Sequence, residues 1–516
     1  MNHKVIDMKT TIKYISSLFV LFAILLAGCD DEFFNLEPTD RIATNKFWQQ
    51  EKDGILATNA CYQAFNPCFK YISFEGCSDN ACTAQTWQDG YMVANGSFNS
   101  SWDFVRVIWT DCYKYIRRTN DVIAHVSEIP DINANLSNRL KGEALVIRAF
   151  IYNIMINLYG DVPFITEPIT LIDDSKKPRE SKSVIIDQLI KDLDVAIGYL
   201  PVRYTENADK GRITKGAALA VKAKLCLYSG RFSEAREAAQ EVIKADYGYR
   251  LLPNYADVFD YNHQMNEEII LDDQYMPDLR MHNSFSQLGP RSAQGTSNYV
   301  PTRSLIDEYE NGDTRRDANF ILPGDPNPYI DGTIFDPAPG SGSADEIGAS
   351  PQATSTGYQY KKYVLKEDLA YPSRCSINII MIRFADVLLM FAEAENEING
   401  PTAAAYDALN KVRERAKVPE VKDLSKDEFR KVLQKERRVE LAGEGLRYFD
   451  ILRWKIAENV LNGTVNGMDY TDTTGAKKTI IIETRKFDKN RNYLWPIPES
   501  ELRLNPELTG KQNPGY

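Results

Sequence analysis

Residues 436–454 read ERRVELAGEGLRYFDILRW, a stretch in which charged and apolar side chains interleave over the whole length. Glu436 and Glu440 lie one helical turn apart, a spacing that could serve a catalytic carboxylate pair. Arginines stand among the acids, so each charge has an opposite neighbour within reach. The charged members are Glu436, Arg437, Arg438, Glu440, Glu444, Arg447, Asp450 and Arg453. We therefore interpret the stretch as an Arg/Glu network that ties helices together.

Helical periodicity extends through the middle and the C-terminal third of the chain. Apolar residues recur at helical spacing over 138–159, and the pattern stops at Gly160. The same pattern over 214–229 begins at Thr214, a residue that favours the N-cap position. Further helices are predicted over 233–245, 381–399, 402–416, 426–442 and 448–461.

Two of these helices are separated only by Gly230-Arg231-Phe232, a tight turn that predicts an antiparallel pair. The spacing of Ala223, Gly230, Phe232 and Ala235 resembles a tetratricopeptide repeat. The predicted fold class is therefore mainly α: a tetratricopeptide-like scaffold of helical pairs with long irregular loops and a few short strands. We expect this scaffold over about 105–250 and 380–461.

Two long segments lack helical periodicity. Glycine and proline punctuate residues 272–371, as in PGDPNPYIDG (323–332) and PAPGSGSADEIGASP (337–351), so loops with a few short strands are predicted there. Residues 61–104 are also irregular and are rich in aromatic side chains. Because loops held on a rigid scaffold often carry binding residues, we expect the ligand side in these two segments.

The N-terminus has the features of an export signal. Residues 1–28 combine a lysine-containing start with an apolar run over 15–26, which falls short of the roughly 20 residues that span a bilayer. Leu26-Ala27-Gly28-Cys29 resembles a bacterial lipobox, in which Cys29 receives the lipid. A plain secretory signal with an incidental cysteine is the alternative. We expect residues 1–28 to be removed, 29–40 to form a lipidated tether and 41–516 to fold as a single domain.

The net charge limits the class of binding partner, and the cysteine content bears on disulfide formation. Lys plus Arg is 61 against 72 for Asp plus Glu, and a net charge of −11 argues against nucleic acid. In an exported chain disulfides are the first hypothesis for clustered cysteines, although an odd number after Cys29 leaves at least one thiol unpaired. The pairing cannot be assigned from sequence within the cluster Cys61, Cys68, Cys77, Cys82 and Cys112.

Six segments, in this order, resemble the SusD/RagB family, the nutrient-binding outer-membrane lipoproteins of Bacteroidetes. They are 109–123, 142–165, 381–400, 408–419, 436–454 and 493–516. The resemblance implies a SusD-like domain that captures glycans without catalysis and delivers them to a SusC-type TonB-dependent transporter. Asp30, Asp31 and Glu32 resemble the surface-export signal of these lipoproteins, which implies an outer-membrane location facing the exterior. An ordinary polar tether is the alternative for these three acids.

No motif in the chain predicts catalysis or a cofactor. It contains no G-x-S-x-G elbow, no H-E-x-x-H and no phosphate-binding glycine loop. The histidines of the mature chain have no metal-like spacing to one another. Asp325, Asn327, Asp331 and Gly332 loosely resemble a calcium loop but lack the remaining ligands and the closing Glu. We therefore predict neither an enzyme nor a metal site, with a structural calcium left as an alternative.

A glycan site needs flat aromatic faces for the C–H-rich sides of sugars and polar groups for their hydroxyls. Aromatic and polar side chains in the two irregular segments are the candidates, although any of them can instead pack in the core. The first segment offers Trp87, Tyr91, Asn95, Asn99 and Trp102. The second offers Tyr275, Arg291, Asn298, Tyr299 and Tyr329.

Two other functions remain open at the level of sequence. The same transporter system could take peptides as its cargo, in which case the ligand side would bind an oligopeptide. A helical repeat scaffold could also recruit other surface proteins, since such repeats bind peptides in their concave face.

Overall fold

The computed structural model describes residues 47–83 and 85–516. The predicted signal peptide, the lipidation site Cys29 and the tether 29–40 lie outside the described residues. Within the described part of the chain, every helix is either too short or too polar to cross a membrane.

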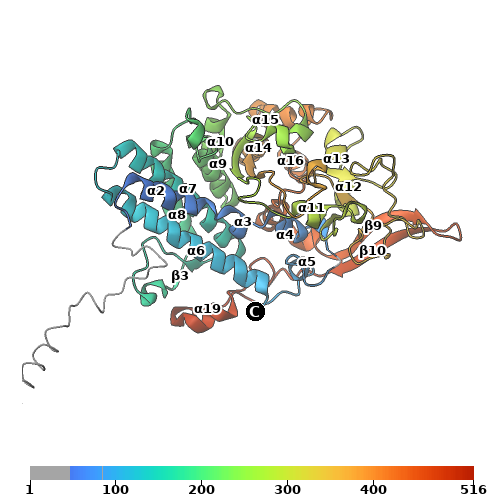
Figure 1. Cartoon of the computed structure of the whole chain (residues 1–516), viewed down its shortest axis with the longest axis horizontal. Coiled ribbons are helices and arrows are strands. Elements are labelled where there is room, and N and C mark those ends of the chain that lie inside the picture. The colour runs from blue at the N-terminus through green and yellow to red at the C-terminus, as the bar shows by residue number, and fades with distance from the viewer. Residues whose placement is uncertain (1–46, 84) are drawn as a thin grey trace, which may run out of the picture.

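Helices that each pack on the next form one half of the molecule (Figure 1). The series runs through α6 (Asp103–His125), α7 (Ala134–Leu158), α8 (Lys182–Tyr199), α9 (Lys215–Tyr228) and α10 (Phe232–Ile243). It continues from α10 to α14 (Phe384–Asn399), which packs with α15 (Ala403–Arg415) and α16 (Lys426–Glu440), while α2 (Glu51–Tyr62) covers α6 and α7. The predicted fold class, a mainly helical scaffold of packed helices, is confirmed.

Local sequence explains where these helices begin and how closely they pack. The Thr214 hydroxyl accepts a hydrogen bond from the Ala217 N–H, and Ser425 forms a capping box with Glu428. Ala223 and Ala235 are fully buried between α9 and α10. Small side chains at these positions allow the two helices to approach closely.

The other half of the molecule is built from loops, short helices and short strands (Figure 1). Its short helices are α3 (Phe65–Cys68), α4 (Tyr71–Gly76), α5 (Tyr91–Ala94), α11 (Ser284–Leu288), α12 (Arg303–Ile306), α13 (Thr314–Asn319), α17 (Arg447–Arg453) and α18 (Ala457–Val460). A last helix, α19 (Glu499–Leu504), lies beneath α6 near the C-terminus (Figure 1).

In the described residues the strands form five antiparallel pairs rather than one sheet. These pairs are β1 (Ala81–Cys82) with β5 (Val300–Pro301), β2 (Val162–Pro163) with β3 (Arg179–Glu180), β4 (Ile269–Asp273) with β8 (Ile379–Arg383), β6 (Phe320–Ile321) with β7 (Gln359–Tyr360), and β9 (Gly463–Thr471) with β10 (Lys477–Arg485). The β9–β10 hairpin projects from the loop-rich half (Figure 1).

Two predicted helices differ from the structure. The helix predicted over 381–399 begins at Phe384, because residues 379–383 form β8 and pair with β4. The helix predicted over 448–461 is divided into α17 and α18, and Lys455 between them has a positive φ of 56°.

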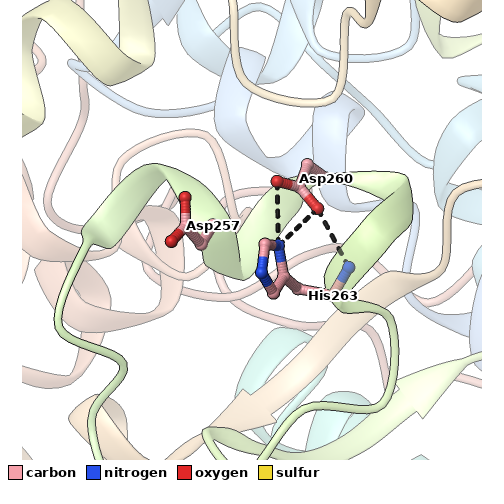
Figure 2. A group of neighbouring side chains, drawn as sticks. All are labelled: Asp257, Asp260 and His263. Carbon is pink, nitrogen blue, oxygen red and sulfur yellow. Dashed lines mark hydrogen bonds and ion pairs between the residues drawn. The ribbon is translucent and has the colours of Figure 1, made fainter.

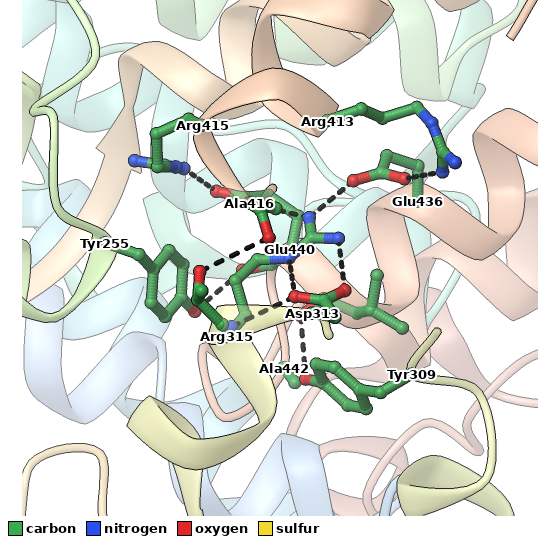
Figure 3. Close-up of polar contacts among 12 residues, drawn as sticks. Tyr255, Tyr309, Asp313, Arg315, Arg413, Arg415, Ala416, Glu436, Glu440 and Ala442 are labelled. Atoms are coloured by element: carbon green, nitrogen blue, oxygen red, sulfur yellow. Dashed lines mark hydrogen bonds and ion pairs between the residues drawn. The ribbon is translucent and has the colours of Figure 1, made fainter. Parts of the chain in front are cut away.

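The Arg/Glu network predicted from residues 436–454 is confirmed and lies in the buried centre of the molecule (Figure 3). Arg383, Arg315 and Arg415 all form ion pairs with the Glu440 carboxylate. Burial alone would raise the pKa of Glu440, but these three guanidinium groups hold it well below its usual value. Glu440 is thus locked in its charged form and serves structure rather than proton transfer.

All seven cysteines after Cys29 are buried and carry free thiols. The disulfides expected from sequence are therefore not formed in the structure of the described residues.

Candidate functional site

The two irregular segments predicted to form the ligand side lie next to each other. Strand β1 of the first segment pairs with β5 of the second, with Ala81 opposite Pro301. Beyond this pair, the Thr302 N–H donates to the Asn80 carbonyl over 2.9 Å. Segments separated by about 200 residues in the sequence thus lie side by side.

Trp87 lies on a loop of the first segment, and the residue is 71% exposed. The loop is fixed on both sides of Trp87 by the second segment: Gln85 Nε2 donates to the Pro351 carbonyl over 2.7 Å, and Tyr299 Oη donates to Gln88 Oε1 over 3.4 Å. An indole that is exposed on an anchored loop is available to a ligand without a large ordering cost.

A hydrogen bond between Trp102 and Asp89 holds the Trp87 loop against the body of the protein. The Trp102 indole N–H donates to the Asp89 carbonyl over 3.3 Å, and the Asp89 carboxylate lies 3.2 Å from Lys70 Nζ. Trp102 is half-buried against the main hydrophobic core. A Cβ added at Gly90 would lie 2.9 Å from the Ser73 carbonyl oxygen, so glycine is required at the point where the loop meets α4. The structure therefore gives Trp102 contacts that hold the Trp87 loop.

The remaining candidates of the first segment lie at turns. Tyr91 is half-buried at the start of α5. Asn95 Oδ1 accepts from the Ser97 N–H over 3.0 Å, and Asn99 Oδ1 accepts from the Ser101 N–H over 2.9 Å. Both amide oxygens thus shape turns, and their amide N–H groups are the part left for a ligand.

Tyr299 and Tyr329 of the second segment are interior residues. Both pack in a second hydrophobic cluster together with Phe285. Tyr329 Oη donates to the Val364 carbonyl over 2.9 Å, and burial raises the pKa of Tyr299. Neither ring is exposed, because residues distant in the sequence pack over both of them.

The other candidates of the second segment differ in exposure. Tyr275 is half-buried, with the Arg280 guanidinium 4.4 Å from its ring centroid and the His282 ring in edge contact. Arg291 is exposed at the start of a 3₁₀ turn, and Asn298 is half-buried. The structure does not bring these three together with Trp87 through any hydrogen bond in the described residues.

Tyr371 is an exposed aromatic residue that the sequence reasoning missed. Its side chain is 66% exposed, and the Arg374 guanidinium lies 5.6 Å from its ring centroid. Arg374 also pairs with Asp278, whose neighbour in sequence, Leu279, is exposed as well. Its exposure could have been expected from its position at the end of the glycine- and proline-rich segment, directly before Pro372.

Two cavities lie on the helical scaffold. One of about 790 Å³ is lined by α6, α7 and α8 and contains Arg148. An apolar groove of about 460 Å³ runs between α6 and α19 and contains Trp109 and Tyr113. Neither of these two cavities is lined by Trp87 or Tyr371, both of which are exposed to solvent.

One group of possible metal ligands exists in the described chain: Asp257, Asp260 and His263, whose nearest ligand atoms lie within 4.8 Å of one another (Figure 2). His263 Nδ1 lies 2.8 Å from Asp260 Oδ1, so a hydrogen bond already accounts for their closeness. The residues that resemble a calcium loop do not form a group of possible metal ligands in the described chain. Asp331 pairs with Lys366, and Asp325 accepts a hydrogen bond from the Leu322 N–H.

The fold defines a class of helical-scaffold proteins, here with exposed aromatic residues on the loops, and the comparisons assign the chain to one family. The sequence model of the SusD family matches residues 246–516, and a second model, described as starch-binding associating with outer membrane, matches residues 51–227. The chain belongs to the SusD family.

Individual relatives cover almost the whole chain. SusD-like protein P25 of Formosa agariphila is 29% identical, over 96% of this chain and 99% of its own. A solved SusD-like protein of Bacteroides fragilis has a TM-score of 0.82 at 26% identity and covers 93% of this chain and 100% of its own. A solved laminarin-binding SusD-like protein has a TM-score of 0.73 at 25% identity, over 91% of this chain and 100% of its own.

Proposed function

We propose that this protein binds glycan chains at the cell surface, without a covalent step, and passes them to a SusC-type TonB-dependent transporter. The observation that carries the proposal is the exposed Trp87 indole, which lies on a loop of the first irregular segment that hydrogen bonds anchor to the second. Family membership and the laminarin-binding relative support a carbohydrate as the ligand.

Binding would use the indole face of Trp87 against the C–H-rich side of a sugar ring. Water is excluded from that contact, and polar groups around it accept or donate hydrogen bonds to the hydroxyls. The exposed Arg291 and the amide N–H groups of Asn95 and Asn99 are the candidates for that role. An open surface, unlike a closed pocket, allows a long chain to extend beyond the contact.

The location follows from the predicted lipid on Cys29. Each buried CH₂ of a lipid chain contributes about 0.8 kcal/mol, so several acyl chains hold a domain firmly on a membrane. Asp30, Asp31 and Glu32 support an outer-membrane position with the domain outside the cell.

Calorimetry with soluble residues 30–516 tests the ligand. Laminarin, starch and other oligosaccharides are titrated into the wild-type protein, Trp87→Ala and Tyr371→Ala. Tyr199→Ala is the matched control, because Tyr199 is an exposed aromatic residue on helix α8 of the scaffold. We expect one glycan to bind, Trp87→Ala to lose most of the affinity and the control to keep it.

Three results would contradict parts of the proposal. Absence of binding to every oligosaccharide, together with oligopeptides that co-purify, would replace the glycan by a peptide. Shortened products after incubation with a bound glycan would overturn the non-catalytic mechanism. Failure of the full-length protein to co-purify with an outer-membrane transporter would remove the proposed partner.

A further inference from the structure

The apolar groove of about 460 Å³ between α6 and α19 is bounded on a third side by the loop 169–176. Trp109 and Ile116 of α6 form part of its wall and are themselves buried. The rim is apolar as well, since Ile172 of the loop is 82% exposed and Leu504 of α19 is 68% exposed. Exposed apolar residues that border one apolar groove, unlike scattered surface residues, are typical of a docking surface.

The groove also carries an excess of positive charge. The charged side chains that line it are Arg117, Lys176 and Glu501. Lys176 pairs with Asp173 of its own loop over 2.8 Å, whereas Arg117 is exposed and makes no ion pair within the described residues. An occupant that combines apolar side chains with neighbouring acids would therefore complement both the walls and the charge of the groove.

The N-terminal part of the chain enters the described structure close to this groove. Trp48 stacks on His125, the last residue of α6, with the ring centroids 5.6 Å apart. Arg117 lies about 12 Å before His125 along the helix axis, and Trp109 lies about 12 Å further. The chain from Leu36 to Trp48 spans up to about 40 Å when it is extended. Residues near position 36 can therefore reach the whole length of the groove.

Residues 30–37 read DDEFFNLE, so apolar side chains stand between acids at both ends of this segment. Phe34 and Leu36 would point to the same side of an extended chain. We propose that this segment docks in the groove, with Phe34 and Leu36 against the apolar walls and the acids near Arg117 and Lys176. The groove volume of about 460 Å³ lies within the range of about 300–1,000 Å³ that encloses a drug-sized ligand, which is enough for two such side chains.

Docking would determine where the lipid anchor leaves the domain. Cys29 directly precedes the segment, so the acylated residue would lie close to α19. The inference rests on the predicted removal of residues 1–28, because the segment then begins the mature chain. It is independent of the glycan, since Trp87 does not line this groove.

Photocross-linking tests the proposal. Residues 30–516 are produced with Phe34→p-benzoylphenylalanine, irradiated and digested, and the linked peptides are identified by mass spectrometry. We expect most links to join position 34 to α6, α19 or residues 169–176 of the same molecule. Thr39→p-benzoylphenylalanine, at a polar position of the same N-terminal stretch, is the control and should give few of these links. Links scattered over other elements, or equal yields from both positions, would overturn the proposal.

The same variant in the full-length protein distinguishes the other possible occupants. The cells that export it are irradiated, and the linked products are separated by size. We expect the links from position 34 to remain within one chain. Links to a second copy or to a transporter would show that another protein takes up this segment, and would also overturn the proposal.

Variants of the rim test the groove itself. Ile172→Glu adds a charge at an exposed position, so the fold should be kept while most links from position 34 are lost. Ile481→Glu is the matched control, because Ile481 is 69% exposed on β10 and does not line the groove. Unchanged links in Ile172→Glu would contradict docking.

Glycan binding by the rim variants is measured separately by calorimetry. We expect Ile172→Glu to bind like the wild-type protein, and a loss of binding would show that the groove serves the ligand instead. Groove links without any glycan binding by the wild-type protein would contradict only the proposed ligand.

Discussion

Arg383 donates two hydrogen bonds to Glu440, one to the carboxylate over 2.5 Å and one to the backbone carbonyl over 2.6 Å. Arg383 is the last residue of β8 and Glu440 is the last residue of α16, and both side chains are fully buried. The pair therefore joins a strand of the loop-rich half to a helix of the scaffold. A buried charge that loses its partner carries an uncompensated desolvation cost.

Replacing Arg383 should therefore be strongly destabilising. We expect Arg383→Met to lower the free energy of unfolding by about 3–5 kcal/mol, because Glu440 and Glu444 lose a shared cation in the interior. Urea unfolding followed by circular dichroism measures the change. Arg106→Met, which removes an exposed pair with Asp103, is the control and should cost at most about 1 kcal/mol. Equal losses in both variants would contradict the role of the buried network.

Asp386 should make the protein sensitive to acid. Burial would raise its pKa, but Lys224 and Arg437 bring the pKa down to about 2. Because the folded-state pKa is below the unfolded value, the ion pairs stabilise the protein above about pH 4, and this contribution is lost as the pH falls toward 2. It amounts to about 2 kcal/mol.

The variant Asp386→Asn tests this linkage by urea unfolding at pH 7 and near pH 3. The difference in unfolding free energy between wild type and variant should be largest at pH 7 and should shrink by about 1 kcal/mol near pH 3, where about half of the linkage contribution is lost. A difference that is independent of pH would show that the ionised carboxylate contributes nothing.

Asp272 should have the opposite pH dependence. Burial raises its pKa to about 6, with side-chain amides of Gln274 and Asn378 as its hydrogen-bond partners. A raised folded-state pKa means that stability is lost as the pH increases from about 4 to 6. We expect Asp272→Asn to stabilise the protein at pH 7 by up to about 3 kcal/mol. The gain is reduced by the loss of one hydrogen bond, because both carboxylate oxygens accept one and an asparagine side chain has a single oxygen.

The measurement is the unfolding free energy of wild type and Asp272→Asn between pH 4 and 7. The gain should be largest at pH 7 and disappear near pH 4. Asp317→Asn, at an exposed site, is the control for a general change of charge. Destabilisation by Asp272→Asn at pH 7 would contradict the raised pKa.

Gln85 should matter for binding only through the position of Trp87. Gln85→Ala removes the hydrogen bond to the Pro351 carbonyl, so the loop gains freedom that binding must take away again. We expect a several-fold weaker affinity in calorimetry with a more unfavourable binding entropy, and a lower melting temperature because Gln85 is buried. Trp87→Ala should keep the melting temperature, because the indole is exposed. An unchanged affinity of Gln85→Ala would show that Trp87 needs no anchor.

Local signals in the sequence were sufficient for much of the scaffold. Thr214 begins α9 because a hydroxyl can cap the first turn, and the charges of residues 436–454 form the network because buried charges need partners. Helix α8 was not predicted, although its buried residues Ile185, Ile186, Leu189 and Leu193 recur at helical spacing. The β9–β10 hairpin gave no such signal, because its exposed residues follow no strict alternation.

The candidate site was less predictable, because exposure in irregular segments depends on distant contacts. Composition selected Trp87 and Tyr299 equally, yet Trp87 is exposed and Tyr299 is buried. The β1–β5 pair and the contact of Tyr299 with Gly76 determine this difference, and neither follows from local sequence. Periodicity identifies the buried face of a helix, but no comparable rule exists for a loop.

The β6–β7 pair has a consequence for how this protein can diversify. Phe320 lies opposite Tyr360 and Ile321 opposite Gln359, so the polypeptide between them leaves and re-enters the body at one place. Parts of this excursion are interior, because Tyr329 and Phe335 pack in the second hydrophobic cluster. Residues 338–344, by contrast, are exposed or half-buried. Insertions or exchanges within 338–344 therefore alter the outer surface while the packed parts of the excursion stay in place.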